Sequence, residues 1–342
     1  MKRHLGDLAI FGGEPAFAEP QHVGRPNLGD RARFLERVGR ILDTRCLTNN
    51  GPFVHAFEER IAALVGVRHC VAVGNATLGL EIAARALGLA GEVIVPAQTF
   101  VATAHALHWQ RITPVFCDID RDTLTLDPAA VERALTPRTT GILAVHLWGR
   151  ACDVEALAAI ARRHRLRLLF DAAHAFGCGH RGRMIGGFGD AEVFSFHATK
   201  VVNCFEGGAI TTDDGDLAAS LRLLRNFGFA GLDDVVACGI NAKMSEISAA
   251  MGLTSLESLD EFIAVNRRNE RLYREALAGI DGLRILPGDD REPRNHQYVV
   301  LEVDEERAGI GRDQILRVLN AENVLARRYF HPGCHRAEPY RS

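Results

Sequence analysis

The sequence predicts an α/β fold, in which a mostly parallel mixed sheet lies between helices and a smaller α+β unit follows. Two observations support this prediction. Short β-type runs alternate with helical runs between residues 70 and 170, and this spacing is typical of crossover connections between parallel strands. The 342 residues, of which 47% are hydrophobic and 24% are charged, can bury one large core and a smaller one.

The first thirty residues contain much glycine, proline and charge but little periodicity. They predict an irregular N-terminal arm, residues 1–30, that packs on a core or reaches a partner subunit. Helical spacing follows over 33–42 and 53–64, and the second helix is expected to stop at Gly66. The stretch 49–52 (Asn-Asn-Gly-Pro) between these helices is a turn signal.

The alternating region then predicts the elements of the sheet. Helices are expected to begin at Thr77 and Thr99, and another is expected over 153–164. Because almost no helix separates the last two strands, we expect some antiparallel pairing there. The predicted strands are 70–73, 92–95, 113–116, 141–145, 167–170, 193–196 and 209–212.

After Asp213 the pattern changes to longer helical segments and short strands, which predicts a second, α+β unit. We therefore expect a large domain over 31–213 and a small C-terminal domain over 214–342. The predicted helices of this unit cover 216–225, a run from Lys243 into the 270s with a break near Leu259, and 312–320, and the predicted strands lie near 283–286 and 297–303.

Charge and composition exclude several classes of function. The net charge is -3 and no basic block occurs, so a nucleic-acid partner is not expected. The eight cysteines form no Cys-x-x-Cys pair and no apolar secretion segment opens the chain, which favours the cytoplasm and argues against structural zinc. No run of about 18 apolar residues occurs, so no membrane span is expected. A small-molecule substrate is the better expectation.

Lys200 is the first candidate for covalent chemistry. Of the 40 basic residues only three are lysines, namely Lys2, Lys200 and Lys243. A partly buried amine can form a Schiff base, whereas a guanidinium stays protonated and cannot. Lys200 ends the stretch 194–200 and is followed by the glycine-rich stretch 206–210. The alternative is that the scarcity of lysine reflects coding bias and that this position has no chemical role.

The stretch 74–77 (Gly-Asn-Ala-Thr) lies between a predicted strand and a predicted helix. Small residues there let the backbone approach an anion, and the free amides of a helix start favour a phosphate. Asn75 or Thr77 can equally be a simple helix cap. Neither Gly-x-Gly-x-x-Gly nor Gly-x-x-x-x-Gly-Lys occurs, so a dinucleotide or a nucleoside triphosphate is not indicated.

Asp171 ends the apolar run 168–170 and has three interpretations. It can cap a helix, ligate a metal or pair with a protonated ring nitrogen, and no carboxylate or histidine cluster with ligand spacing supports the metal. A carboxylate beside a pyridinium keeps it protonated, and that charge makes pyridoxal 5'-phosphate (PLP) an electron sink. Lys200 for the aldehyde, Asp171 for the ring nitrogen and the helix start near Thr77 for the phosphate are the three groups that this cofactor needs.

Five segments of the chain carry a resemblance to a known family. They are 48–52 (Thr-Asn-Asn-Gly-Pro), 95–103 (Val-Pro-Ala-Gln-Thr-Phe-Val-Ala-Thr), 170–177 (Phe-Asp-Ala-Ala-His-Ala-Phe-Gly), 195–200 (Ser-Phe-His-Ala-Thr-Lys) with 206–208 (Glu-Gly-Gly), and 239–246 (Gly-Ile-Asn-Ala-Lys-Met-Ser-Glu). In this order, over roughly residues 45–255, they resemble the DegT/StrS family of sugar aminotransferases. These are PLP enzymes of the aspartate aminotransferase fold, fold type I, which the resemblance implies here.

The resemblance implies roles for the residues that match the family's motifs. Lys200 would carry the cofactor as a Schiff base, and Asp171 would pair with the pyridine nitrogen. Phe100 would stack on the cofactor ring, although on sequence alone a core position is as consistent. His174 stands where many members have Gln and others have His, which implies a contact to the cofactor's phenolic oxygen or to Lys200. A satisfied core histidine is the alternative for this position.

Further matches concern the phosphate group. Thr77, the neighbouring amides of Ala76 and Leu78, and Ser195 match phosphate-binding positions of the family. Ser195 can also bond only locally. Asn241 matches a residue that reaches the phosphate from the other subunit, which implies a homodimer, although Asn also suits a turn.

The C-terminal segment matches the family in part. Residues 329–336 resemble a substrate-proximal stretch. Family members usually continue for some tens of residues after it, so the resemblance implies a shortened small domain.

The resemblance implies transamination of a nucleotide-linked keto sugar, most similar to dTDP-linked 4-keto or 3-keto 6-deoxyhexoses, with glutamate as the amino donor. The donor amine would displace Lys200, which would then act as the base that moves a proton. Lys200 disfavours the dehydratase branch of the family, where histidine replaces the lysine. The alternatives are an aminotransferase for a cyclitol or another keto compound, and a non-catalytic, regulatory PLP-binding protein. No residue of the sequence identifies which keto sugar or which nucleotide the substrate contains.

Overall fold

The computed structural model describes residues 2–341, which cluster into two compact units. The larger unit holds residues 26–264, 289–297 and those from 330 onward, and the smaller unit holds residues up to 25, 265–288 and 298–329. The domain limits expected from the sequence stay a prediction. No helix within the described residues is both long and apolar enough to cross a bilayer.

A seven-stranded sheet forms the centre of the larger unit. Its strands are β2 (His69–Val73), β3 (Glu92–Pro96), β4 (Thr113–Cys117), β5 (Thr139–Val145), β6 (Arg167–Asp171), β9 (Ala191–Ser195) and β10 (Gly208–Thr212). They lie in the order β2-β10-β9-β6-β5-β3-β4. All neighbours are parallel except that β10 runs antiparallel to both β2 and β9. The predicted parallel sheet and its antiparallel pair are therefore confirmed.

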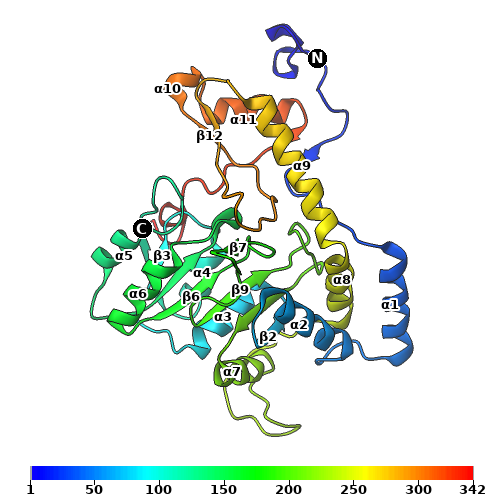
Figure 1. Ribbon diagram of the computed structural model, residues 1–342, viewed down its shortest axis with the longest axis vertical. Coiled ribbons are helices and arrows are strands. Elements are labelled where there is room, and N and C mark those ends of the chain that lie inside the picture. The colour runs from blue at the N-terminus through cyan, green and yellow to red at the C-terminus, as the bar shows by residue number, and fades with distance from the viewer. Residues whose placement is uncertain (1, 342) are drawn as a thin grey trace. The chain divides into compact units, whose positions relative to one another are not determined.

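Helices cover both faces of this sheet (Figure 1). One face packs against α2 (Pro52–Val65), α5 (Pro128–Ala134), α6 (Val154–His164) and α8 (Glu246–Glu257), and the other against α3 (Ala76–Ala86), α4 (Ala102–His108) and α7 (Gly215–Arg225). Alternate strand residues belong to opposite faces, so Phe170 packs with the first layer whereas Leu169 and Val193 pack with the second. Asp171 and Ser195 follow Leu169 and Val193 by two residues and therefore face the layer of α3, α4 and α7.

The sequence prediction missed α5 and placed the start of α4 three residues too early. α5 has seven residues, too few to repeat an apolar face, and it begins where Asp127 accepts the amides of Ala129 and Ala130. α4 begins at Ala102 rather than Thr99, because the Thr103 N–H bonds to the Phe100 carbonyl and closes a separate turn first. The break predicted near Leu259 is confirmed, because α8 ends at Glu257 and α9 (Leu259–Leu277) begins two residues later.

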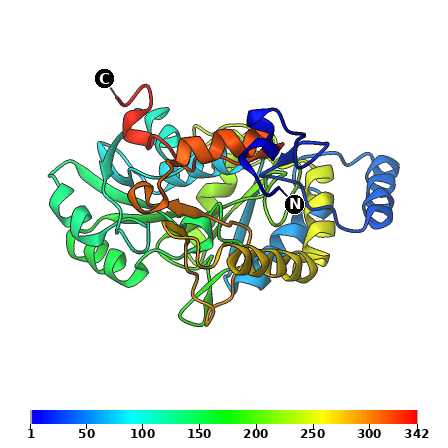
Figure 2. The same cartoon turned by 90° about the horizontal axis from the view of Figure 1, so that it is seen from above.

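α1 (Arg31–Thr44) lies beside α8 at one side of the larger unit (Figures 1 and 2). The buried Arg37 side chain joins the two helices, because it donates to the Thr254 hydroxyl at 2.7 Å and to the Glu257 carboxylate. Leu35 and Leu42 of α1 are more than half exposed. This helix therefore presents apolar side chains away from the packed core.

The smaller unit includes the N-terminal residues. Besides residues 265–277 of α9, its elements are η1 (Leu5–Asp7), η2 (Ala9–Phe11), β1 (Gln21–His22), β11 (Leu283–Ile285), β12 (Leu301–Val303), α10 (Glu305–Ala308), α11 (Arg312–Ala321) and β13 (Val324–Leu325). β1 pairs in parallel with β13, and β11 pairs antiparallel with β12. The first residues thus form short helices and a two-residue strand instead of a wholly irregular arm.

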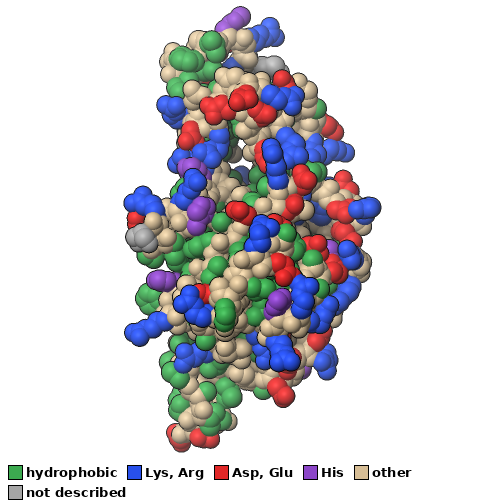
Figure 3. All heavy atoms as spheres, turned by 90° about the vertical axis from the view of Figure 1, so that its left-hand side faces the viewer, with side chains coloured by type: hydrophobic (Ala, Val, Ile, Leu, Met, Phe, Trp, Pro, Cys, Tyr) green, Lys and Arg blue, Asp and Glu red, His purple; other side chains and the backbone are tan. Residues whose placement is uncertain are grey.

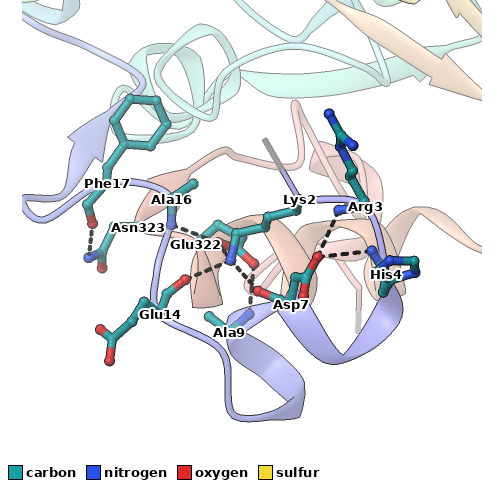
Figure 4. Close-up of polar contacts among 10 residues, drawn as sticks. All are labelled: Lys2, Arg3, His4, Asp7, Ala9, Glu14, Ala16, Phe17, Glu322 and Asn323. Atoms are coloured by element: carbon teal, nitrogen blue, oxygen red, sulfur yellow. Dashed lines mark hydrogen bonds and ion pairs between the residues drawn. The ribbon is translucent and has the colours of Figure 1, made fainter.

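Glu322, directly after α11, is the main polar anchor of the N-terminal residues (Figure 4). Its carboxylate accepts the N–H groups of Ala9 at 2.8 Å and Ala16 at 2.7 Å. The Lys2 ammonium lies 3.0 Å from the same carboxylate. One side chain therefore holds the segment at three points.

The strand predicted over 297–303 is shorter in the structure, where β12 begins at Leu301. His296 has a left-handed backbone with φ of 51°. The Gln297 side chain donates to the Thr199 carbonyl at 2.7 Å and accepts the Val201 N–H at 3.0 Å. Gln297 is therefore bonded to the turn that contains Lys200, and the pairing with the β11 segment starts only at Val300, whose carbonyl accepts the Leu286 N–H at 3.0 Å. Four small elements complete the larger unit, namely β7 (Gly179–His180) and β8 (Arg183–Met184), which form a hairpin, and the 3-10 turns η3 (Leu147–Gly149) and η4 (Cys334–Arg336).

Candidate active site

The residues singled out by the sequence meet at one edge of the sheet. Asp171 is the last residue of β6 and Ser195 is the last residue of β9, and these two strands are parallel neighbours. Lys200 follows in the turn after β9, where its N–H donates to the His197 carbonyl at 2.8 Å. Carboxyl ends of parallel strands are the usual place for ligands in such sheets.

Lys200 is half-buried and interacts electrostatically with Asp171. Burial lowers the pKa of the Lys200 amine from 10.5 to about 8, and the Asp171 carboxylate opposes part of this shift. A neutral amine is the nucleophile that attacks an aldehyde. The site therefore makes Lys200 far more reactive near neutral pH than an exposed lysine.

Asp171 is 4% exposed, and burial raises the pKa of its carboxyl above the ordinary value. Hydrogen bonds from Thr103 and Ala173 act against burial, as do the positive charges of Lys200 and His146. The Thr103 hydroxyl donates to Oδ2 at 2.8 Å and the Ala173 N–H donates to Oδ1 at 3.0 Å. The carboxylate is thus held by a donor on each oxygen.

The start of α3 lies beside the first residue of β10. Asn75 caps the helix, because its Oδ1 accepts the Leu78 N–H at 2.9 Å. The amides of Ala76 and Thr77 belong to the first turn, where no carbonyl of the same helix can accept them. A Cβ on Gly208 would lie 2.8 Å from the Ala76 nitrogen, so only glycine allows this approach. The cap interpretation of Asn75 is confirmed, and it is compatible with an anion at the two free amides.

His174 is 8% exposed, and its Nδ1 accepts the Trp148 N–H at 3.2 Å. The neutral ring therefore carries its proton on Nε2. Burial, helped by the Lys200 charge, holds the pKa of His174 well below its usual range. The Asn295 amide donates to the His174 carbonyl at 2.9 Å and fixes the turn.

The ring of Phe330 lies near the rings of Phe100, Trp148 and His174. Phe330 lies 6.1 Å from Phe100, 6.1 Å from His174 and 6.4 Å from Trp148, measured between ring centroids. Phe100 is 54% exposed, which excludes the interpretation of this residue as part of the core. The segment 329–336 thus contributes a ring to the same site.

Trp148 combines two unusual features. Its backbone is left-handed, with φ of 54°, which is rare for a bulky residue and common at functional sites. The side chain is 7% exposed, yet its indole N–H has no hydrogen-bond acceptor within residues 2–341. Buried indole N–H groups normally find a partner, so this donor suits a ligand oxygen.

Ser195 and Asn241, the other two residues predicted to bind the phosphate, make no contact in the described part of the chain that tests this role. Ser195 Oγ accepts the His197 N–H at 3.4 Å, a long contact that agrees with the local alternative. Asn241 is exposed, and the next residue, Ala242, accepts the Gly74 N–H at 2.8 Å. Asn241 is therefore placed near the start of α3 while its side chain stays accessible.

Sequence reasoning missed Thr103 and Trp148 as site residues. A signal for Thr103 exists, because Thr99 and Thr103 are four residues apart and both lie in the segment that resembles the family. Nothing in the sequence signals the left-handed backbone of Trp148, although Gly149 after it, with φ of 78°, marks a turn.

Comparison with known proteins agrees with this geometry. The DegT/DnrJ/EryC1/StrS aminotransferase family matches residues 29–342. A dTDP-4-amino-4,6-dideoxy-D-glucose transaminase of Escherichia coli is 38% identical over 313 residues, which cover 91% of this chain and 84% of the relative. A GDP-perosamine synthase of Caulobacter vibrioides is 37% identical over 329 residues, or 93% and 86% of the two chains.

A solved structure is similar over almost the whole chain. The crystal structure of DesI in the presence of its TDP-sugar product superposes with a TM-score of 0.96 and 57% identity. The similarity covers 99% of this chain and 86% of that one.

Proposed function

The chain belongs to the DegT/DnrJ/EryC1/StrS aminotransferase family, and we propose that it aminates C4 of a dTDP-linked 4-keto-6-deoxyhexose with PLP as cofactor. The Escherichia coli relative is named for a 4-amino-4,6-dideoxyglucose carried on dTDP. DesI, at 57% identity, has a TDP-sugar product. These names favour C4 over C3 and dTDP over other nucleotides.

The observation that carries this proposal is the Lys200 amine, with its lowered pKa, beside the buried Asp171 carboxylate at the sheet edge. The residues fit PLP. Lys200 offers a reactive amine for the aldehyde, Asp171 a carboxylate for the ring nitrogen, and the start of α3, kept open by Gly208, offers amides for the phosphate. When bound, the cofactor supplies an electron sink.

Each residue of the site then has a proposed task. Lys200 holds the aldehyde carbon and, once the amine of the donor glutamate has displaced it, moves a proton to and from the donor's α-carbon. Asp171 keeps the ring nitrogen protonated. His174, with its proton on Nε2, donates a hydrogen bond to the phenolic oxygen, and Phe100 stacks on the ring.

The phosphate site is proposed to involve two copies of the chain. Ala76, Thr77, Leu78 and Ser195 surround the phosphate from one copy, and Leu78 contributes through the capped helix start. Asn241 of a second copy completes the site.

Exposed apolar surface supports a dimer. The loop 226–243 after α7 carries Phe227, Leu232, Val235 and Val236, which are between 45% and 95% exposed. Hydrophobic side chains gather at this end of the molecule (Figure 3). Apolar patches of this kind typically mark protein contacts.

Borohydride reduction tests the central claim. The purified protein should show the visible absorbance of a Schiff base, and reduction should fix the label on the peptide that contains Lys200. Lys200→Arg, which keeps the charge but cannot form the bond, should abolish the visible band. A label on Lys2 or Lys243, or a band that survives in the variant, contradicts the proposal.

Amino transfer is tested separately. Incubation with glutamate alone should release 2-oxoglutarate in an amount equal to the active sites, because one amino group is stored per site. With dTDP-4-keto-6-deoxyglucose present, turnover should continue and the sugar should gain about 1 Da in mass, because the carbonyl oxygen is replaced by an amino group and a hydrogen. Turnover of a 3-keto sugar in preference would overturn the assignment to C4.

A further inference from the structure

A hydroxyl group of α4 supports the Asp171 carboxylate. Thr103 Oγ1 lies 2.8 Å from Asp171 Oδ2, although the two residues are 68 positions apart in the chain. The other oxygen is bonded to the Ala173 N–H, which belongs to the turn that follows β6. Thr103 is fully buried, so water cannot reach its place if the hydroxyl is removed.

The direction of this hydrogen bond is fixed by chemistry. An ionised carboxylate only accepts, so the Thr103 proton points to Asp171. The Thr99 hydroxyl lies 2.9 Å from Thr103 Oγ1 and must then be the donor in that pair. Thr99, which is 1% exposed, is also shielded from water. Two hydroxyl dipoles in series thus point toward Asp171, and each polarises the next.

Thr99 is itself held by the segment that follows Phe330. The Cys334 N–H donates to the Ala97 carbonyl at 2.8 Å, and the Cys334 thiol donates to the Thr99 carbonyl at 3.1 Å. Cys334 is 2% exposed. The backbone from Ala97 to Thr99 is thus bonded to Cys334 at two points, which helps to keep both hydroxyls in place beside Asp171.

We propose that Thr103 is a positioning residue, whose hydroxyl, aligned by Thr99, keeps Asp171 ionised and in one orientation for the ring nitrogen of PLP. This inference rests on the proposed function of Asp171. It adds a residue of α4 to a site whose other proposed residues lie at strand ends, in the segments between elements and at the start of α3.

The surroundings of Asp171 explain why this donor matters. Burial favours the neutral acid, and the Thr103 hydrogen bond is the strongest of the contributions that act against it. Lys200 shares the site, and its positive charge acts in the same direction as the Thr103 hydrogen bond. His146 lies on the other face of the sheet, stacked on Phe170 and 3.3 Å from the Glu192 carboxylate. Without Thr103, Asp171 would keep one side-chain or backbone donor among the described residues, the Ala173 N–H, together with the charges of Lys200 and His146.

Thr103→Val tests the proposal, because valine keeps the shape of threonine and removes the hydroxyl. The holoenzyme is loaded with PLP labelled with 15N in the ring, and the nitrogen chemical shift shows whether the ring nitrogen is protonated. Thr103→Val should lose that proton at a lower pH than the unchanged protein. Its PLP dissociation constant should rise about tenfold, as expected for one lost hydrogen bond to a charged group. Thr103→Ser should restore both values.

Two controls separate this role from a purely structural one. Thr211→Val removes the hydroxyl of a buried threonine on β10, which bonds to the Glu192 carbonyl on the opposite face of the sheet, and should change neither measurement. In an Asp171→Asn background, Thr103→Val should change the dissociation constant less than about twofold, because the two residues act as a unit. If Thr103→Val does not fold, Thr103→Ala removes the same hydroxyl.

The outcomes are distinct. A ring nitrogen that stays protonated to the same pH in Thr103→Val as in the unchanged protein overturns the proposal, and so does an equal loss of PLP affinity with and without Asp171. Failure of the unchanged protein to bind PLP at Lys200 contradicts the proposed function itself and is seen in the borohydride experiment.

Discussion

At the scale of a single residue, the most informative property is the charge state of the Lys200 amine. Its pKa of about 8 results from burial that the Asp171 carboxylate only partly offsets. At pH 7.5 about a quarter of such amines are neutral, compared with about 0.1% for an ordinary lysine. The same burial that removes the amine from water thus increases the neutral fraction of the Lys200 amine.

We expect the rate at which PLP binds covalently to the cofactor-free protein to rise with pH and to level off above about pH 8. The reason is that only the neutral Lys200 amine attacks the aldehyde. Stopped-flow measurement of the visible band over pH 6 to 10 gives this profile. Asp171→Asn removes the charge that raises the pKa, so its profile should shift to lower pH. A rate that still rises tenfold per pH unit at pH 9.5 would contradict this assignment.

Residue types were enough to single out Lys200 and Asp171 as candidates, because each carries rare chemistry at or just after the end of a strand. The role of Phe100 could not be decided from sequence, since exposure depends on what packs around a ring, and the structure excludes the core alternative. Thr103 could not be assigned because its partner, Asp171, is distant in sequence and near only once α4 packs on the sheet. The proposed roles of all the site residues, Lys200 and Asp171 included, stay predictions.

At the scale of elements, the N-terminal residues show how a segment without periodicity can still be ordered. β1 and β13 contribute only two residues each, and Glu322 lies 313 positions after Ala9. No local sequence pattern can predict such contacts, because they depend on a carboxylate from another element. By contrast, the helices and strands of the larger unit repeat their apolar faces over many residues, and their positions were mostly predictable.

Glu322→Gln should loosen the N-terminal residues without affecting the sheet. The carboxylate accepts two amides and faces Lys2, and these contacts lower its pKa below 4.5. Because the pKa in the folded protein is lowered, the stabilisation is complete above pH 4.5 and is lost as the pH falls through the folded value. Hydrogen exchange of the Ala9 and Ala16 amides measures the effect, and both should exchange faster in the variant at pH 7.

The matched control for this variant is Glu306→Gln, at an exposed glutamate of α10 in the same unit. It should leave the exchange of Ala9 and Ala16 unchanged. Equal protection in the Glu322→Gln variant and the unchanged protein would show that backbone packing alone holds the segment.

At the scale of the whole molecule, the parallel sheet and its antiparallel pair were predictable from the alternation of strands and helices. The strand order was not. Nothing in the local pattern places β10 between β2 and β9, because the choice depends on which strands come together after the chain has folded back. The proposed dimer cannot be derived from a single chain; it rests on the match at Asn241 and on the exposed apolar side chains of loop 226–243.

Mixing two inactive variants tests whether a second copy completes the site. Lys200→Ala lacks the nucleophile and Asn241→Ala lacks the proposed phosphate contact, so each alone should be inactive or strongly impaired. In a mixed dimer one site has an intact Lys200 and receives an intact Asn241 from the other chain. Refolding the two variants together in equal amounts should restore about a quarter of the original activity. No recovery would show that Asn241 serves its own chain.

The place of β10 also determines when the site can exist during synthesis. β2 is an edge strand whose neighbour, β10, is made only after residues 74–207. Until then the apolar residues Val71 and Val73 have no strand beside them on that side, and Gly208 is not present to receive the start of α3. Non-local pairing of this kind forms late and leaves the growing chain open to wrong contacts. A nascent chain released before residue 208 would carry Asp171, Lys200 and the start of α3, but it would lack Gly208 and β10, against which the start of α3 lies.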